Sequence, residues 1–156
     1  MTVEQPKQIE TLEDMFQNQD YLQTEVYGDG TSPADFLKVY GPRAGIQFYK
    51  DMHVALVDEL HEALAEIGWK PWATSDHFNR EAVKGELVDA FHFFMNLCLV
   101  AGVSARDLIE GYTSKSAKNI QRQADGYDGV STKCAKCKRA LDDEAVYCTA
   151  DRCDVE

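Results

Sequence analysis

The stretch E-L-V-D-A-F-H-F-F-M-N-L-C-L-V, residues 86–100, sets two acidic residues, Glu86 and Asp89, in an almost continuous apolar run. Residues three apart share one face of a helix, so the two carboxylates lie one turn from each other. Apolar side chains point in nearly every direction around the axis, which predicts a buried helix over residues 79–101. Two buried carboxylates this close repel each other and are costly to desolvate. Because a divalent cation removes both costs, the stretch predicts a metal site.

A second acidic pair lies on the helix that apolar periodicity predicts over residues 46–67. Glu59 and Glu62 are again three residues apart and share one helix face. Such a pair on its own is most often a solvated surface feature. Opposite Glu86 and Asp89, it predicts four carboxylates that converge on one site, where hard oxygen ligands suit Mg²⁺ or Mn²⁺ better than zinc. Glu59 or Glu62 would also orient and deprotonate an attacking water.

Helical periodicity covers most of the remaining chain. It predicts a first helix over residues 8–27 and a last one over residues 104–124. Ser104 is the expected N-cap of the last helix, with Asp107 three residues later in a capping-box arrangement. No strand pattern and no internal repeat stands out. We therefore expect an all-α domain with a four-helix-bundle-like core over residues 1–130.

The last predicted helix carries a row of hydrogen-bond donors. Lys115, Asn119 and Arg122 are spaced by four and three residues, which places them on one face. Such a face suits phosphate oxygens. The alternative is an ordinary solvated basic face, and the neighbouring carboxylate site favours phosphate binding over it.

Two residues inside the apolar run have simpler expected roles. His92 is flanked by phenylalanines, and a lone histidine on an apolar helix is most often a core residue with its hydrogen bonds satisfied. Cys98 is expected to be a small core residue. We expect chemistry from neither.

The chain changes composition at residue 131 and becomes rich in cysteine, lysine and aspartate. Residues 131–156 hold four of the five cysteines of the chain: Cys134, Cys137, Cys148 and Cys153. The first pair has the spacing of a zinc knuckle, and the second pair is more widely spaced. We expect a small module that folds around structural Zn²⁺. A reduced tail without fixed structure and a disulfide-linked tail are the alternatives.

Charge and hydropathy limit the classes of partner. The formal net charge of −11 gives no general attraction to nucleic acid or to an anionic membrane, so we expect neither as a partner. The polar start of the chain does not resemble a signal peptide, and no apolar run is long enough to span a bilayer. We therefore expect a cytoplasmic protein, in which cysteines favour metal binding over disulfides.

Four segments in this order resemble the all-alpha NTP pyrophosphatase superfamily, and in particular its dimeric dUTPase and MazG-like members. They are D-E-L-H-E-A (58–63), W-K-P-W (69–72), E-L-V-D-A-F-H-F-F (86–94) and K-S-A-K-N-I-Q-R-Q-A-D-G-Y (115–127). The resemblance covers about residues 10–128. It implies metal binding by both acidic pairs and phosphate contacts from four residues: Lys115, Asn119, Arg122 and Tyr127. It also implies a base pocket that includes three residues: Gln19, Trp69 and Trp72.

The resemblance implies a homodimeric enzyme, with a tetramer as the alternative, that hydrolyses a deoxynucleoside triphosphate, dUTP first, to the monophosphate and pyrophosphate with Mg²⁺. Two positions depart from the family pattern: Ser116 replaces an asparagine on the last helix, and Gln23 replaces an asparagine after Leu22. They leave open the same chemistry on dCTP or on a purine nucleotide such as dGTP. They also leave open a binding regulator without turnover, although the complete set of four acidic positions favours activity.

Overall fold

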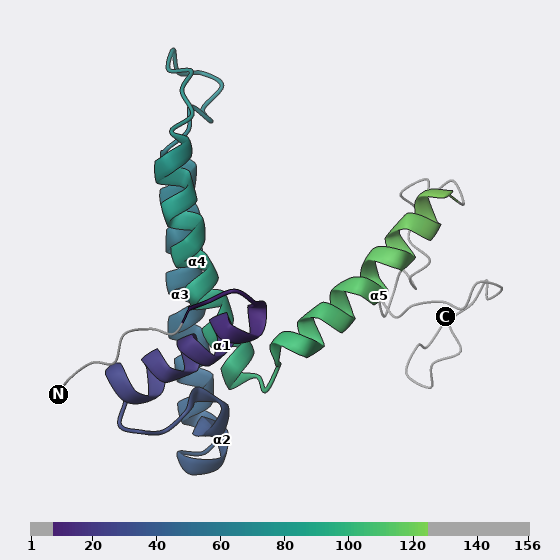
Figure 1. Ribbon diagram of the computed structural model, residues 1–156. Coiled ribbons are helices and arrows are strands. Elements are labelled where there is room, and N and C mark those ends of the chain that lie inside the picture. The colour runs from purple at the N-terminus through teal and green to yellow at the C-terminus, as the bar shows by residue number, and fades with distance from the viewer. Residues whose placement is uncertain (1–7, 125–156) are drawn as a thin grey trace, which may run out of the picture. The chain divides into compact units, whose positions relative to one another are not determined.

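The computed structural model of the chain describes residues 8–124, and every element in that range is helical (Figure 1). The elements are α1 (Leu12–Tyr21), the π-helix η1 (Leu22–Val26), the 3-10 helix η2 (Pro33–Asp35), α2 (Phe36–Val39), α3 (Pro42–Ala65), α4 (Arg80–Val100) and α5 (Ala105–Ala124). A single isolated β-bridge in this range joins Ile67 and Phe78 in the loop between α3 and α4. The predicted all-α class is confirmed.

The chain separates into two compact units whose boundary lies inside α5, between Gly111 and Tyr112. The first unit holds α1 to α4 and the start of α5. The capping box predicted for α5 is present, because the Ser104 backbone N–H donates to Asp107 at 2.9 Å and the Asp107 N–H donates to the Ser104 hydroxyl at 3.1 Å. The predicted domain boundary at residue 130 and the cysteine module lie outside the described residues.

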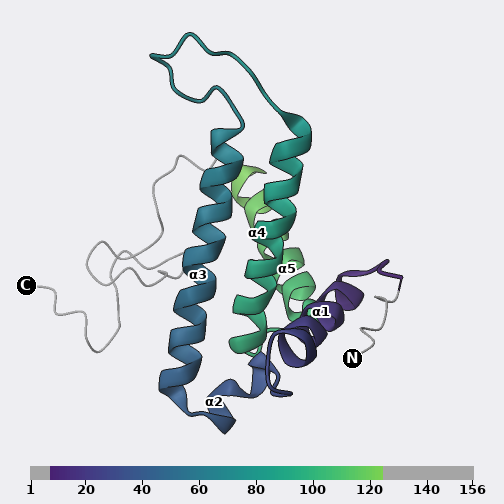
Figure 2. The ribbon, with the colours of Figure 1, turned by 90° about the vertical axis from the view of Figure 1, so that its left-hand side faces the viewer.

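The main feature of the first unit is an antiparallel hairpin in which α3 and α4 pack side by side (Figure 2). Pro42 occupies the first turn of α3, where its fixed φ angle and missing N–H cost nothing. Asn79 caps α4 by accepting from the Ala82 N–H. Asn79 also ties the two helices together, because its backbone N–H and its side-chain amide donate to the Glu66 carbonyl and carboxylate at 3.0 and 2.9 Å.

Helix α1 packs across the C-terminal half of α4 (Figure 2). Thr11 and Asp14 form a reciprocal capping box that starts α1. Phe16 is buried and joins a core cluster with Met95 and Cys98. Cys98 is thus a core residue, as predicted, and burial raises the pKa of its thiol, which makes it a poor nucleophile.

The two halves of α4 differ in burial. Its C-terminal half is enclosed by α1 and α3, whereas in its N-terminal half Leu87 and Val88 are 50% and 51% exposed. Asp89 is exposed and Glu86 is half-buried. The prediction of a helix buried all round is therefore wrong for the N-terminal half, because within this unit only α3 packs against it. No single helix among residues 8–124 is long and apolar enough to cross a membrane.

Candidate active site

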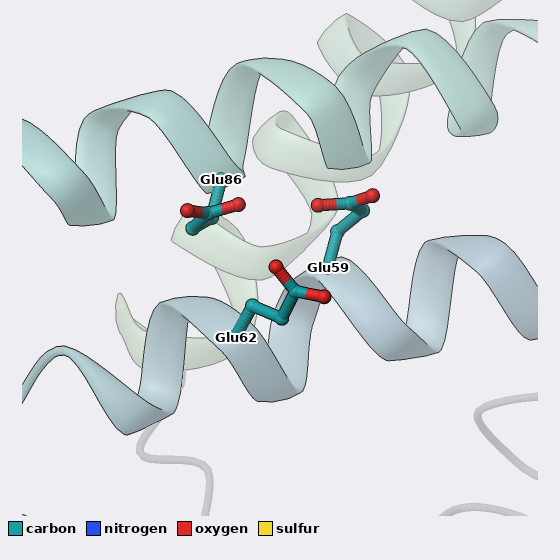
Figure 3. Close-up of side chains that lie close together, drawn as sticks. All are labelled: Glu59, Glu62 and Glu86. Atoms are coloured by element: carbon teal, nitrogen blue, oxygen red, sulfur yellow. The ribbon is translucent and has the colours of Figure 1, made fainter.

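Three glutamates meet between the two helices of the hairpin (Figure 3). Glu59 and Glu62 come from neighbouring turns of α3, and Glu86 comes from the facing turn of α4. One carboxylate oxygen from each lies within 4.8 Å of the others. Two oxygens bound to the same Mg²⁺ at about 2.1 Å are at most about 4.2 Å apart, so small side-chain rotations suffice to share one cation. The set of hard oxygen donors fits Mg²⁺ or Mn²⁺.

The register that sets Glu86 opposite Glu59 is held on both sides of the cluster. On the loop side, Asn79 hydrogen-bonds to Glu66. On the other side, the Asn96 side-chain Nδ2 of α4 donates to the Met52 Sδ of α3 at 3.2 Å. These two links restrict sliding of α4 along α3, which would separate the carboxylates.

The carboxylates of the cluster raise one another's cost of ionisation, and the effect is clearest at Glu59. The pKa of Glu59 is raised, first by its partial burial and then by the negative charge of Glu62. A hydrogen bond with Glu86 and the charges of Asp89 and Glu86 raise it further. The Glu59 carboxyl is therefore harder to ionise than an ordinary glutamate in the absence of a cation. A bound divalent cation would oppose this shift, because it favours the ionised carboxylate.

Asp89 lies one turn beyond Glu86 on α4. Its charge acts on Glu59, but its carboxylate is not among the three that lie within 4.8 Å of one another. The structure thus brings together three of the four predicted metal ligands. The role of Asp89 as a fourth ligand stays a prediction.

The residues predicted to bind phosphate lie on α5, in the second unit. Lys115, Asn119 and Arg122 are exposed along that helix. Tyr127 lies outside the described residues. Contact between these donors and a triphosphate at the acidic cluster stays a prediction.

The residues predicted to form the base pocket flank the acidic cluster from opposite sides of it along α3. Trp69 and Trp72 lie in the loop after α3, with their rings packed edge to face at a centroid distance of 6.1 Å. Gln19 of α1 contacts Asn96, which in turn contacts Met52, seven residues before Glu59 on α3. Within the first unit, Gln19 is therefore not a neighbour of Trp69 and Trp72, which contact each other.

A chain of buried polar side chains was missed by the sequence prediction. Gln19 is 3% exposed and Asn96 is 1% exposed. The Gln19 Nε2 donates to the Asn96 Oδ1 at 2.8 Å, and the Gln19 Oε1 lies 2.6 Å from the Nδ1 of His92. The available signal was Asn96 itself, since a polar residue in an apolar run needs a buried partner.

Comparison with known proteins gives the family. The family model of dUTPase matches residues 11–103. A dCTP pyrophosphatase of Enterobacteria phage LZ5 is 29% identical over 146 residues, covering 76% of this chain and 84% of that protein. A dCTP pyrophosphatase of Enterobacteria phage T4 is 26% identical over 106 residues, covering 53% of this chain and 62% of that protein. No solved structure matches the chain.

The family match spans α1, the hairpin and all four predicted metal ligands. Both relatives are named as pyrophosphatases that act on a deoxynucleoside triphosphate, which is the predicted class of reaction. The predicted superfamily and enzyme class are both confirmed. The chain belongs to the dUTPase family of the all-alpha NTP pyrophosphatases and is a nucleoside triphosphate pyrophosphohydrolase.

Proposed function

We propose that the chain hydrolyses a pyrimidine deoxynucleoside triphosphate to the monophosphate and pyrophosphate, with Mg²⁺ as its cofactor. The observation that carries the proposal is the group of three glutamates facing one another across α3 and α4. The family points to dUTP, and the names of the two relatives point to dCTP. A pyrimidine base is common to both.

The residues divide the work according to their positions. Glu59, Glu62 and Glu86, with Asp89 one turn away, would hold the cation. When bound, the cation neutralises charge on the phosphate chain and makes a water more acidic. The pKa of Glu59 is raised, so its carboxylate also suits the task of orienting that water and accepting its proton. Lys115, Asn119, Arg122 and Tyr127 would hold the phosphate chain.

The direct test is pyrophosphate release from a panel of dNTPs and NTPs, with Mg²⁺ and with EDTA. We expect turnover that requires Mg²⁺ and is highest for a pyrimidine deoxynucleotide. EDTA should abolish it, and excess Mg²⁺ should restore it. The absence of metal-dependent turnover on every nucleotide would contradict the proposal and favour a binding regulator.

We further propose that the chain acts as a homodimer or tetramer in the cytoplasm. Its hairpin exposes apolar side chains on both helices, among them Val54, Leu60, Leu87 and Val88. Each such side chain buried at an interface stabilises the assembly. Light scattering coupled to size exclusion should give two or four times the chain mass of 17.6 kDa. A monomer at micromolar concentration would contradict this.

The cysteine module is proposed to bind structural Zn²⁺ through Cys134, Cys137, Cys148 and Cys153. Metal analysis of the purified protein should find about one zinc per chain, as expected of a four-thiolate site. The double substitution Cys134→Ser and Cys137→Ser should remove it, whereas Cys98→Ser should not, because Cys98 lies in the core of the first unit. Zinc that persists in the double variant would place the metal elsewhere.

A further inference from the structure

A row of hydrogen-bonded side chains joins α1 to the hairpin. Its hydrogen bonds all run in one direction, which the thioether of Met52 sets. A thioether sulfur can accept a hydrogen bond but cannot donate one, so Asn96 turns its Nδ2 toward Met52. The Asn96 Oδ1 then faces Gln19 and must receive a donor, which is the Gln19 Nε2 at 2.8 Å. The Gln19 Oε1 is left facing His92, and a carbonyl oxygen only accepts.

The direction of this chain fixes the tautomer of His92. Since the Gln19 Oε1 accepts, the His92 Nδ1, at 2.6 Å from it, must carry the proton. In the neutral ring the other nitrogen, Nε2, is then an acceptor without a proton. The opposite tautomer would set two acceptors against each other at the Gln19–His92 contact.

His92 lies where the acidic face of α4 meets an apolar pocket. Each step of three residues turns a helix by about 300°, so Glu86, Asp89 and His92 form a row that winds from the glutamate cluster toward the pocket. His92 follows Asp89 by a rise of about 4.5 Å. The pocket has a volume of about 670 Å³ and lies between α1 and α4. Most of its lining is apolar and includes Met15, Phe91 and Met95, while Asn18, Arg80 and Lys84 also border it.

We propose that the Nε2 of His92 contacts the pyrimidine base and accepts a hydrogen bond from its exocyclic amino group, so that the site prefers cytosine to uracil. The proposal rests on the pyrophosphohydrolase function above and adds its base specificity. Gln19 and Asn96 are positioning residues: they hold the tautomer of His92 and do not touch the base. Gln19 thereby enters base recognition through His92, consistent with its burial.

The chemical difference between the two bases lies at position 4. Cytosine carries an amino group there, which donates, and uracil carries a carbonyl oxygen, which accepts. An acceptor on the protein pairs with the first and opposes the second. A buried polar site rejects a substrate that leaves it unpaired more strongly than it rejects a change in size.

Two measurements test the proposal. The first is the ratio of kcat/KM for dCTP to that for dUTP, which should exceed about tenfold in the unchanged protein. His92→Gln should lower this ratio about tenfold, because a glutamine amide can turn to donate or to accept. His53→Gln makes the same chemical change at an exposed position of α3 and should leave the ratio unchanged. The second is nitrogen NMR of the imidazoles, which should show His92 protonated at Nδ1 and bare at Nε2.

Gln19→Met tests the positioning role. It keeps most of the buried volume and removes the acceptor for the His92 Nδ1 proton. It should lower the dCTP to dUTP ratio and shift the His92 signals toward a mixture of tautomers, whereas a purely structural role would lower stability and leave both unchanged. His92 protonated at Nε2, or an unchanged ratio in an active His92→Gln variant, would overturn the proposal while the enzyme function stood. No metal-dependent turnover in the unchanged protein would overturn both.

Discussion

Glu62→Gln is expected to lower kcat by about 10²- to 10⁴-fold, because the cation that Glu62 would help to hold supplies several kcal/mol of transition-state stabilisation. Glu62 is the exposed member of the glutamate group, and its oxygen lies within 4.8 Å of ligand atoms of Glu59 and Glu86. Glutamine keeps the size of the side chain but removes its charge. The cation would then be held by fewer anionic oxygens. Turnover is measured as pyrophosphate release at saturating Mg²⁺ and nucleotide.

The matched control for this variant is Glu81→Gln. Glu81 is an exposed carboxylate in the first turn of α4, where it pairs with Lys84 at 3.9 Å, and exposed pairs contribute little to stability. The Glu81→Gln variant should turn over substrate at the rate of the unchanged protein. Both variants should keep the helical circular dichroism of the unchanged chain. Turnover near that of the unchanged protein in Glu62→Gln would exclude the glutamate group as the active site.

Glu59→Gln is expected to abolish turnover and at the same time stabilise the metal-free protein. The pKa of Glu59 is raised in the folded state, so folding favours its protonated form. The stability that this proton contributes is present below the unfolded pKa and is lost as the pH rises through the folded pKa. A glutamine stays neutral at every pH. At pH 7 to 8 without metal, the variant should therefore unfold at a temperature roughly 2–4 °C higher.

Adding Mg²⁺ should reverse the order of the unfolding temperatures, so that the unchanged protein becomes more stable than Glu59→Gln. Binding of Mg²⁺ requires ionised carboxylates, so it competes with protonation of Glu59 and is weaker at acidic pH. Mg²⁺ should then raise the unfolding temperature of the unchanged protein more at pH 8 than at pH 5, and should raise that of Glu59→Gln little. Thermal unfolding at both pH values, with Mg²⁺ and with EDTA, measures this. A metal-free Glu59→Gln protein less stable than the unchanged one would contradict the assigned environment of Glu59.

Local sequence rules account for the helices and for most of the acidic cluster. The third predicted helix, residues 79–101, agrees with α4 to within one residue at each end. The spacing of Glu59 and Glu62 and the position of Glu86 follow from helix periodicity alone. The first predicted helix was too long as a regular α-helix, because its last turn widens into a π-helix at Leu22–Val26. The second predicted helix, residues 46–67, began too late, because Pro42 starts α3 four residues earlier.

Tertiary contacts account for what periodicity could not supply. Exposure of Asp89 depends on which neighbour covers the N-terminal half of α4, and no local pattern carries that information. The separation of Gln19 from Trp69 follows from where α1 crosses the hairpin. The hydrogen bond between Gln19 and Asn96 joins residues 77 positions apart, so only the folded chain reveals it. The only sign of this hydrogen bond in the sequence was Asn96, a single asparagine in an apolar run.

That hydrogen bond also restricts how the protein can change over generations. Sliding α1 by one turn would leave the Asn96 Oδ1 in the core without its donor, at a cost comparable to a lost buried hydrogen bond. Replacing only one of Gln19 and Asn96 leaves the other without its partner, whereas replacing both by apolar residues of similar shape leaves only the His92 Nδ1 without its acceptor. Positions 19 and 96 are therefore expected to co-vary. Among descendants of this sequence the two residues should be kept together or replaced together, although α1 and α4 are far apart in the chain.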